Sequence, residues 1–337
     1  MTAAAPLLEV SGLKTYFRLR RRGLWSEPAV LRAVDDVDFA IPAGRTFGLV
    51  GESGSGKSTM ALSVMRLVAP TAGRVLFEGR DLLALPEPAL RSLRKDMQII
   101  FQDPYSSLNP RLRAGEIVAA PLVIHRIGTA RERTERAAEL LQLVGLRPDQ
   151  AELFPHQFSG GQRQRIAIAR ALASQPRLVV CDEPVSALDV AIQAQVLNLL
   201  RKLQNELRLT YLFISHDFSV IRFMCDEIGV MYLGKIVERA PRQALFERPL
   251  HPYTRALLAS VPSLDSGPGA APLKGEPPSP ITPPAGCRFA GRCPHATALC
   301  RAEAPPLRRF GDHFVACHLV SDDGRPPGES DAGAGRA

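Results

Sequence analysis

Hydrophobic and polar positions follow two patterns over the first 262 residues. Continuous apolar runs that end in small or polar residues lie at 46–50, 178–181 and 211–214. Between these runs, apolar side chains recur at helical spacing, as at Met60, Val64 and Leu67. Continuous apolar strands are typical of a parallel sheet that is buried on both faces. The pattern therefore predicts an α/β fold over residues 1–262, with ligands beyond the carboxyl ends of the strands.

The composition changes after residue 262. Residues 263–285 contain seven prolines and three glycines, which predicts a linker that is partly in polyproline conformation. Residues 286–320 contain four of the six cysteines and are expected to form a small separate lobe. Residues 321–337 have almost no apolar side chain larger than alanine, so we predict a disordered tail.

Charge and hydropathy limit where the protein acts. The formal net charge is +8, and the one dense basic run is Arg18–Arg22. Because the other basic residues are scattered, we expect this charge to face a membrane surface or a protein, and no nucleic-acid partner is predicted. No apolar run approaches the roughly 18 residues of a membrane span, and the first residues lack the basic region of a signal peptide. These features predict a cytosolic protein.

A glycine-rich loop follows the first apolar run. Residues 51–58, GESGSGKS, fit the phosphate-binding pattern G-x-x-x-x-G-K-[ST] between a predicted strand and a predicted helix. In such a loop (P-loop), glycines let backbone N–H groups approach phosphate oxygens, and the helix presents its positive N-terminus. We expect Lys57 to reach the β- and γ-phosphates and Ser58 to hold Mg²⁺. The predicted nucleotide contacts are Gly51, Ser53, Gly54, Gly56, Lys57, Ser58 and Thr59.

Two acids end the second apolar run. Asp182 closes the predicted strand, where a carboxylate on the magnesium side is expected. Glu183 follows it and is predicted to polarise an attacking water. General-base assistance of this kind is typically worth roughly 10²–10⁴-fold in rate. The pair therefore indicates nucleotide hydrolysis.

Four further motifs give the chain a strong resemblance to the ATP-binding-cassette (ABC) ATPases. Phe158–Gln162, FSGGQ, is similar to the family's signature loop, and Gln102 in IIFQDP is similar to its Q-loop. Ser186–Asp189, SALD, resembles the D-loop, and His216 the switch histidine. All of these motifs follow one another in the order of the family.

The resemblance implies a fold and a set of site residues. The implied fold class is α/β, a P-loop NTPase of the ABC type, with a helical subdomain over residues 104–176. The implied cofactors are ATP and Mg²⁺, and the implied magnesium ligands are Ser58, Gln102 and Asp182. Glu183, His216 and Gln102 would be the catalytic residues. Phe17 in LKTYF would contact the adenine, with Tyr16 as a near alternative.

The resemblance also implies how the ATPase works. In this family two cassettes stack head to tail, so that the signature loop of one closes on the ATP of the other. Here Ser159, Gly160, Gly161 and Gln162 would supply that contact. Because the chain has one P-loop and one signature loop, it is expected to pair with a paralogue or with a second copy of itself.

Longer stretches resemble one branch of the family, the importer ATPases for oligopeptides, dipeptides and nickel. These stretches are FQDPYSSLNPR, HPYTRALLASVP and the cysteine-rich C-terminal extension, and residues 18–39 are similar to the second of the paired ATPases. The implied function is to power peptide import from the cytoplasmic face of the cell membrane, as a peripheral subunit. Partners would be a second ATPase, two transmembrane permease subunits and, indirectly, an extracytoplasmic peptide-binding protein. The alternative is a soluble ABC-type ATPase that acts on nucleic acid or ribosomes.

The four C-terminal cysteines need a separate explanation. Cys287, Cys293, Cys300 and Cys317 have the spacing C-x5-C-x6-C-x16-C, and a disulfide framework is not expected in the cytosol. Four thiolates suit zinc or an iron–sulfur cluster by count. Because the spacing lacks a tight C-x2-4-C pair, and because of the importer resemblance, we favour a [4Fe–4S] cluster over Zn²⁺ or no metal. The segment is short, so a metal is expected to stabilise it, far from the ATP.

Overall fold

The computed structural model describes residues 5–19, 29–260 and 275–328. The chain divides into two compact units, each assembled from separate segments. Unit 1 comprises residues 1–9, 40–47 and 74–215, and unit 2 comprises 10–39, 48–73 and 216–337. Residues 263–274 of the predicted linker and 329–337 of the predicted tail lie outside the described residues, so the domain boundaries given above remain predictions. Among the described ranges, no helix combines the length and the hydropathy that a membrane span requires.

A parallel sheet forms the centre of unit 1. Strands β8 (Thr210–Ser215), β7 (Leu178–Asp182) and β6 (Met97–Ile100) lie side by side in that order. All residues of β7 and β8 are buried, which explains why their sequences are apolar without alternation. In the register, Asp182 at the end of β7 lies beside Ile214 of β8. The predicted α/β fold with a buried parallel sheet is thus confirmed.

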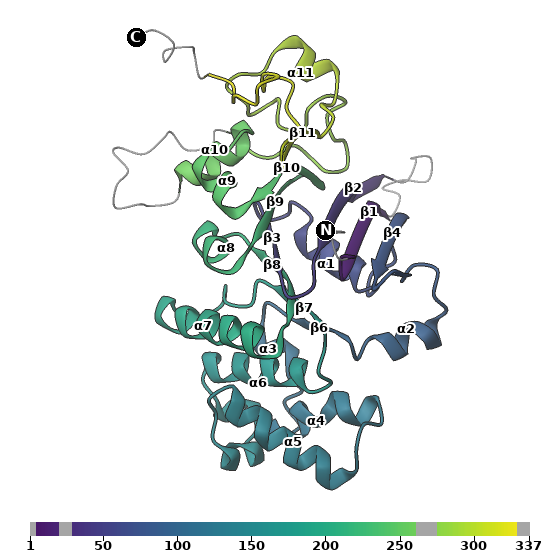
Figure 1. Ribbon diagram of the computed structural model, residues 1–337, viewed down its shortest axis with the longest axis vertical. Helices are drawn as coiled ribbons and strands as arrows, with labels where there is room; N and C mark the ends of the chain where they lie inside the picture. Colours follow the sequence, from purple (N-terminus) through teal and green to yellow (C-terminus); the bar gives the residue numbers. More distant parts are fainter. Residues whose placement is uncertain (1–4, 20–28, 261–274, 329–337) are drawn as a thin grey trace. The chain divides into compact units, whose positions relative to one another are not determined.

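The rest of unit 1 is mostly helical. The exception is a short antiparallel pairing of β4 (Ala72–Phe77) with β5 (Arg80–Asp81). The helices are α2 (Glu87–Leu93), α3 (Pro104–Ser107), α4 (Ala114–Ile124), α5 (Ala130–Leu143), η1 (Pro148–Glu152), η2 (Pro155–Gln157), α6 (Gly160–Leu172) and α7 (Val190–Leu207). Helices α4, α5 and α6 pack against one another (Figure 1). Between β6 and β7 every described element is helical.

Unit 2 begins with a strand pair and the first helix. Strands β1 (Leu8–Arg18) and β2 (Val30–Ile41) are neighbours in one sheet. Strand β3 (Thr46–Val50) leads into unit 2 and is followed by the P-loop and α1 (Lys57–Val64). Later elements are α8 (Phe218–Met224), β9 (Glu227–Tyr232), β10 (Lys235–Pro241), α9 (Arg242–Glu247) and α10 (Pro252–Ala259).

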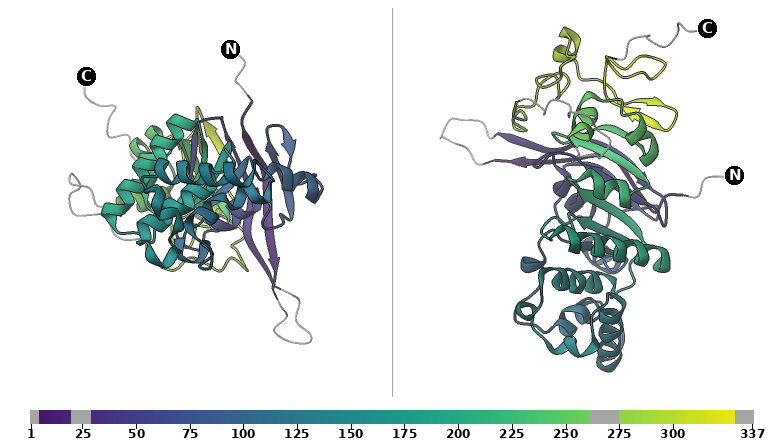
Figure 2. Two further views of the ribbon diagram at one scale, coloured as in Figure 1. Left: turned by 90° about the horizontal axis from the view of Figure 1, so that it is seen from below. Right: turned by 90° about the vertical axis from the view of Figure 1, so that its left-hand side faces the viewer.

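The C-terminal segment continues a sheet of unit 2. It contributes α11 (Ala298–Ala302), β11 (Arg308–Phe310) and β12 (His313–Val315). Strand β12 pairs antiparallel with β10, so that Val315 lies beside Glu238, and the order is β11-β12-β10-β9. Figures 1 and 2 show this yellow hairpin beside the green strand β10. The segment is therefore an extension of unit 2 and not a free-standing lobe.

Candidate nucleotide site

The P-loop in unit 2 is shaped by two glycines that no other residue could replace without a shift. A Cβ atom on Gly51 would collide with the carbonyl oxygen of Met231. A Cβ atom on Gly56 would collide with the carbonyl oxygen of Ala33, and its φ of 107° lies in the left-handed region. Both obstacles are backbone atoms, which cannot move aside as a side chain can. Close packing of the loop against the backbone thus explains why the motif has glycine at these two positions.

Lys57 closes the loop on itself. Its side chain is buried, with 4% exposed, and its Nζ donates hydrogen bonds to the carbonyl oxygens of Gly51 at 2.8 Å and Glu52 at 2.9 Å. Ser58 and Thr59 lie in the first turn of α1, and no acidic residue lies there to oppose an anion. The N-terminus of α1, with its backbone N–H groups, is therefore suited to hold phosphate.

Two predicted catalytic side chains meet within unit 1. Gln102, just after β6, donates from Nε2 to Oε2 of Glu183 at 3.0 Å. Asp182 precedes Glu183 as the last, buried residue of β7, with 7% exposed. Sequence motifs 81 residues apart are thus in contact because β6 and β7 are adjacent parallel strands.

Glu183 is held in an unusual backbone conformation. Its φ is 47°, in the left-handed region that disfavours residues with a Cβ. Its N–H donates to the carbonyl oxygen of Ile214 at 3.0 Å, and its carbonyl accepts from the N–H and the hydroxyl of Ser186 at 3.2 and 3.1 Å. Strain of roughly 1–3 kcal/mol at such a residue persists only when its surroundings fix it, and it is common at functional sites.

The predicted signature residues form the start of α6 in unit 1. Ser159 is the N-cap: its hydroxyl accepts from the N–H of Gln162 at 3.3 Å, and the Gln162 side chain accepts from the N–H of Ser159 at 2.9 Å. Gly160 and Gly161 are the first two helical residues. A Cβ on Gly161 would lie 2.5 Å from Cγ2 of Ile192 in α7, so the residue type is set by helix packing.

The remaining predicted residues lie in unit 2. Phe17 near the end of β1 is 36% exposed and is thus accessible to a ligand. Tyr16, the alternative, donates its hydroxyl to Asp35, which also pairs with the buried Arg288. Because the Tyr16 hydroxyl is bonded to Asp35, Phe17 is the better candidate for the contact with adenine. His216 is exposed and follows the last residue of β8.

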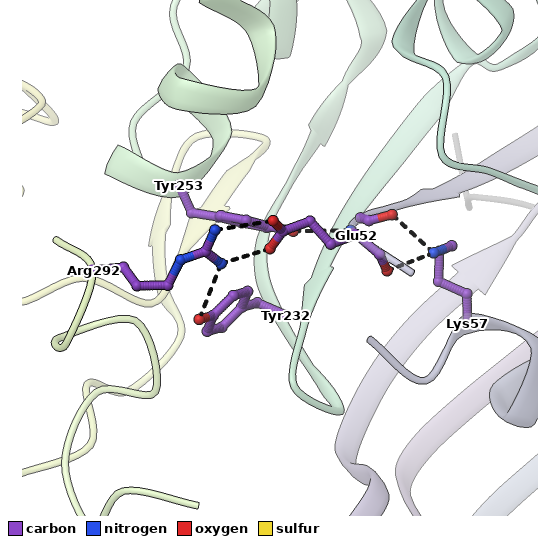
Figure 3. Close-up of polar contacts among 6 residues, drawn as sticks. Glu52, Lys57, Tyr232, Tyr253 and Arg292 are labelled. Atoms are coloured by element: carbon purple, nitrogen blue, oxygen red, sulfur yellow. Dashed lines mark hydrogen bonds and ion pairs between the residues drawn. The ribbon is translucent and has the colours of Figure 1, made fainter. Parts of the chain in front are cut away.

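Three residues in or beside the P-loop were not identified as site residues from the sequence (Figure 3). Arg292 of the C-terminal segment donates from Nη1 and Nη2 to the carboxylate of Glu52 in the P-loop, at 2.7 and 3.0 Å. The hydroxyl of Tyr253 in α10 accepts from the N–H of Glu52 at 3.0 Å. The C-terminal segment, whose metal was expected to lie far from the ATP, thus contacts the loop that is predicted to bind ATP. Glu52 occupies an unspecified position of the motif, so the motif could not reveal it.

The predicted metal centre is also wrong. In the described part of the chain, no three His, Cys, Asp or Glu side chains converge in a way that could hold a metal ion, so neither the [4Fe–4S] cluster nor Zn²⁺ is supported. The four cysteines, Cys287, Cys293, Cys300 and Cys317, instead line one small cavity of about 10 Å³. Burial raises the pKa of Cys287 and Cys293, and raises that of Cys317 to about 11, which favours neutral thiols.

The C-terminal segment is held by contacts with the rest of unit 2. The buried carboxylate of Glu238 in β10 accepts from the N–H groups of Leu250 and His251, at 2.6 and 3.0 Å, and is bonded to Nε2 of His313 at 2.6 Å. Phe289 packs on Tyr232, Tyr253 and His251 with ring centroids 5.3–5.7 Å apart. A segment too short to fold alone is thus folded on the rest of unit 2.

Comparison with known proteins places these features in a family. The family model described as "ABC transporter" matches residues 34–186, and the one described as "Oligopeptide/dipeptide transporter, C-terminal region" matches residues 237–300. The chain is 50% identical over 329 residues to "Oligopeptide transport ATP-binding protein AppF" of Bacillus subtilis, covering 95% of this chain and 100% of that protein. It is also 50% identical to "Probable peptide ABC transporter ATP-binding protein y4tS" of Sinorhizobium fredii, covering 93% and 90%.

Solved structures share the fold. A dimeric post-hydrolysis state of the ATP-binding cassette MJ0796, bound to ADP and Pi, matches with a TM-score of 0.62 and 32% identity over 70% of this chain and 98% of that one. The structure of cbiO1 from Clostridium perfringens, part of the ABC transporter complex cbiONQ, matches with a TM-score of 0.62 and 25% identity over 72% and 91%.

Proposed function

Because the chain belongs to the ABC transporter family, and within it to the oligopeptide/dipeptide transporters, we propose that it is the ATP-hydrolysing subunit of a peptide importer. The observation that carries this proposal is the 50% identity to an oligopeptide transport ATP-binding protein along 95% of this chain and the whole of that protein. The separate match of residues 237–300 to the C-terminal region of oligopeptide/dipeptide transporters supports it.

The P-loop residues would bind the triphosphate. Backbone N–H groups of Gly54, Gly56 and the start of α1 suit the phosphate oxygens, and the ammonium of Lys57 lies at the loop. Ser58, Gln102 and Asp182 would hold Mg²⁺, because hydroxyl, amide and carboxylate oxygens are the donors that this hard cation prefers. The ion supplies positive charge to the phosphate oxygens when it is bound.

Glu183 would polarise the water that attacks the γ-phosphate. Oε2 of Glu183 accepts a hydrogen bond from the side-chain amide of Gln102. Movement of the Q-loop would therefore change the orientation of the Glu183 carboxylate. The backbone of Glu183 is held in one conformation by its hydrogen bonds, which limits the positions that its carboxylate can take. His216 would contact the γ-phosphate region as the switch histidine, and Phe17 would contact the adenine.

Turnover would require a second cassette. We propose that Ser159–Gln162 at the N-terminus of α6 closes on the ATP held by that partner, since the backbone N–H groups at the start of a helix suit a γ-phosphate. The partner is a paralogue or a second copy. Two permease subunits would carry the peptide, and a peptide-binding protein outside would deliver it. The chain would then act peripherally at the cytoplasmic face of the membrane.

The alternative, a soluble ABC-type ATPase that acts on nucleic acid or ribosomes, is not favoured. The relatives described above carry peptide-transport names, and the C-terminal family match has a transporter description. No observation in the described residues favours the alternative.

The proposal is tested by reconstitution. The chain, its partner ATPase and the permeases are co-purified and placed in proteoliposomes, with a mixture of di- to hexapeptides and the peptide-binding protein. ATP-dependent accumulation of peptides, read by mass spectrometry, is expected for wild type and not for a complex with Lys57→Ala. ATP-dependent transport of no peptide, with transport of another solute class, would contradict peptide import while leaving the ATPase assignment intact.

A further inference from the structure

The P-loop of this chain contains an acid of its own. Glu52 is the second residue of the loop, and its side chain is 29% exposed. A fixed negative charge beside a site for three phosphates disfavours their binding, because like charges at short range repel even across a moderate dielectric. This loop therefore needs a compensating cation if it is to bind a nucleotide tightly.

Arg292 supplies that cation from a distant part of the sequence. Its guanidinium forms a two-bond ion pair with both carboxylate oxygens of Glu52, and its side chain is only 5% exposed. The group also lies 5.8 Å from the ring centroid of Tyr232, whose hydroxyl accepts a 3.4 Å bond from Nη1. A two-bond pair of this geometry, half-buried as it is here, fixes orientation as well as charge.

Glu52 is in fact held at all of its polar groups (Figure 3). Arg292 binds the carboxylate, the hydroxyl of Tyr253 accepts from the N–H, and the carbonyl accepts from Nζ of Lys57. The position of the Glu52 peptide therefore helps to set the position of the Lys57 ammonium. A shift of Arg292 would be transmitted to Lys57 through one residue.

The C-terminal segment holds Arg292 in place. The N–H of Arg292 donates to the carbonyl of Phe289 at 2.9 Å, in the turn that also contains Cys287 and Cys293. Phe289 in turn packs on Tyr253 at 5.3 Å between ring centroids. Arg292 and Tyr253, which both hydrogen-bond to Glu52 of the P-loop, thus belong to one packed cluster.

We propose that Arg292, assisted by Tyr253, is a positioning residue for ATP: it neutralises Glu52 and fixes the Glu52 peptide that orients Lys57. The C-terminal segment of the chain then sets the nucleotide affinity of the P-loop, and a partner that displaced this segment would weaken ATP binding. This inference rests on the proposed assignment of residues 51–58 as the ATP-binding loop.

The test is equilibrium binding of a fluorescent ATP analogue with Mg²⁺ to the full-length chain. Arg292→Ala should weaken binding by about tenfold or more, because it leaves the Glu52 charge uncompensated. Glu52→Gln should bind at least as well as wild type, and Glu52→Gln with Arg292→Ala should recover to within about threefold of wild type. Arg301→Ala removes an exposed cation of α11 and is the matched control, with no change expected.

The results separate the inference from its premise. If wild type does not bind the analogue, or Lys57→Ala binds it equally well, the P-loop assignment fails. If Lys57→Ala abolishes binding while Arg292→Ala binds like wild type, only the positioning role fails. A double variant that binds as poorly as Arg292→Ala would show a merely structural role. Should Arg292→Ala not fold, as judged by circular dichroism, weaker binding by the folded Glu52→Gln variant would overturn the proposal.

Discussion

His251 makes the docking of α10 sensitive to acid. Its side chain is 1% exposed, and its Nδ1 accepts a hydrogen bond from the N–H of Tyr253. Through this bond His251 caps the N-terminus of α10. An accepting nitrogen has no proton, so the ring is neutral in the folded chain. Burial lowers the pKa of His251 to about 4, although the nearby Glu238 raises it in part. Protonation would break the cap of the helix that carries Tyr253 to the P-loop.

The sign and the size of the effect follow from this shift. The ordinary pKa of histidine is 6.5, so between pH 6.5 and 4 the unfolded chain binds a proton that the folded chain does not. The free energy of unfolding therefore falls as the pH falls through this window, and is unaffected by this group above it. At 1.36 kcal/mol per pKa unit, the loss is about 2 kcal/mol at pH 5 and about 3 kcal/mol at pH 4.

The assay is urea unfolding of the full-length chain at pH 7.5 and pH 5.0. His251→Asn keeps a good N-cap residue and removes the titration. Its loss of stability between the two pH values should be smaller than that of wild type by about 2 kcal/mol. His295→Asn, at an exposed histidine of the C-terminal segment, is the control and should behave as wild type. Equal losses in wild type and His251→Asn would refute the argument.

Three more outcomes are expected. Lys57→Ala should reduce affinity for ATP by at least about tenfold in an equilibrium binding assay, since it removes a phosphate-facing cation; unchanged affinity would count against the loop. Gly161→Val should destabilise the chain by about 1–3 kcal/mol in urea, because even a Cβ would lie 2.5 Å from Ile192, whereas equal stability would contradict the packing of α6. The purified chain alone should be a poor, monomeric ATPase, and mixing with its partner cassette and permeases should raise the rate; full activity of a strict monomer by light scattering would argue against a two-cassette mechanism.

Features that are local in the sequence could be predicted from it. The P-loop is eight consecutive residues, and its strand and helix flank it directly, so its fold and chemistry follow from one short pattern. Asp182 and Glu183 end a strand whose apolar run is visible in the sequence. The contact of Gln102 with Glu183 follows from parallel pairing of β6 and β7, which the sequence patterns did not indicate because β6 was not among the predicted strands.

Long-range contacts could not be predicted in this way. Arg292 and Glu52 are 240 residues apart, and Arg288 and Asp35 are 253 apart, so no periodicity links them. Arginine is an ordinary surface residue in a sequence, and only the fold shows that these two are buried. Cysteine count and spacing suggested a metal centre. They contain no information on the contacts of β10 and Phe289, which hold the segment in the fold.

Hydrolysis of ATP by this chain, with Glu183 as the residue that polarises water, has one direct test. Phosphate release is measured in the assembled transporter with wild-type chain and with Glu183→Gln, and ATP binding is measured in the same samples. The variant should bind ATP as wild type does while its turnover falls by roughly 10²-fold or more. Equal turnover of the two complexes would contradict it.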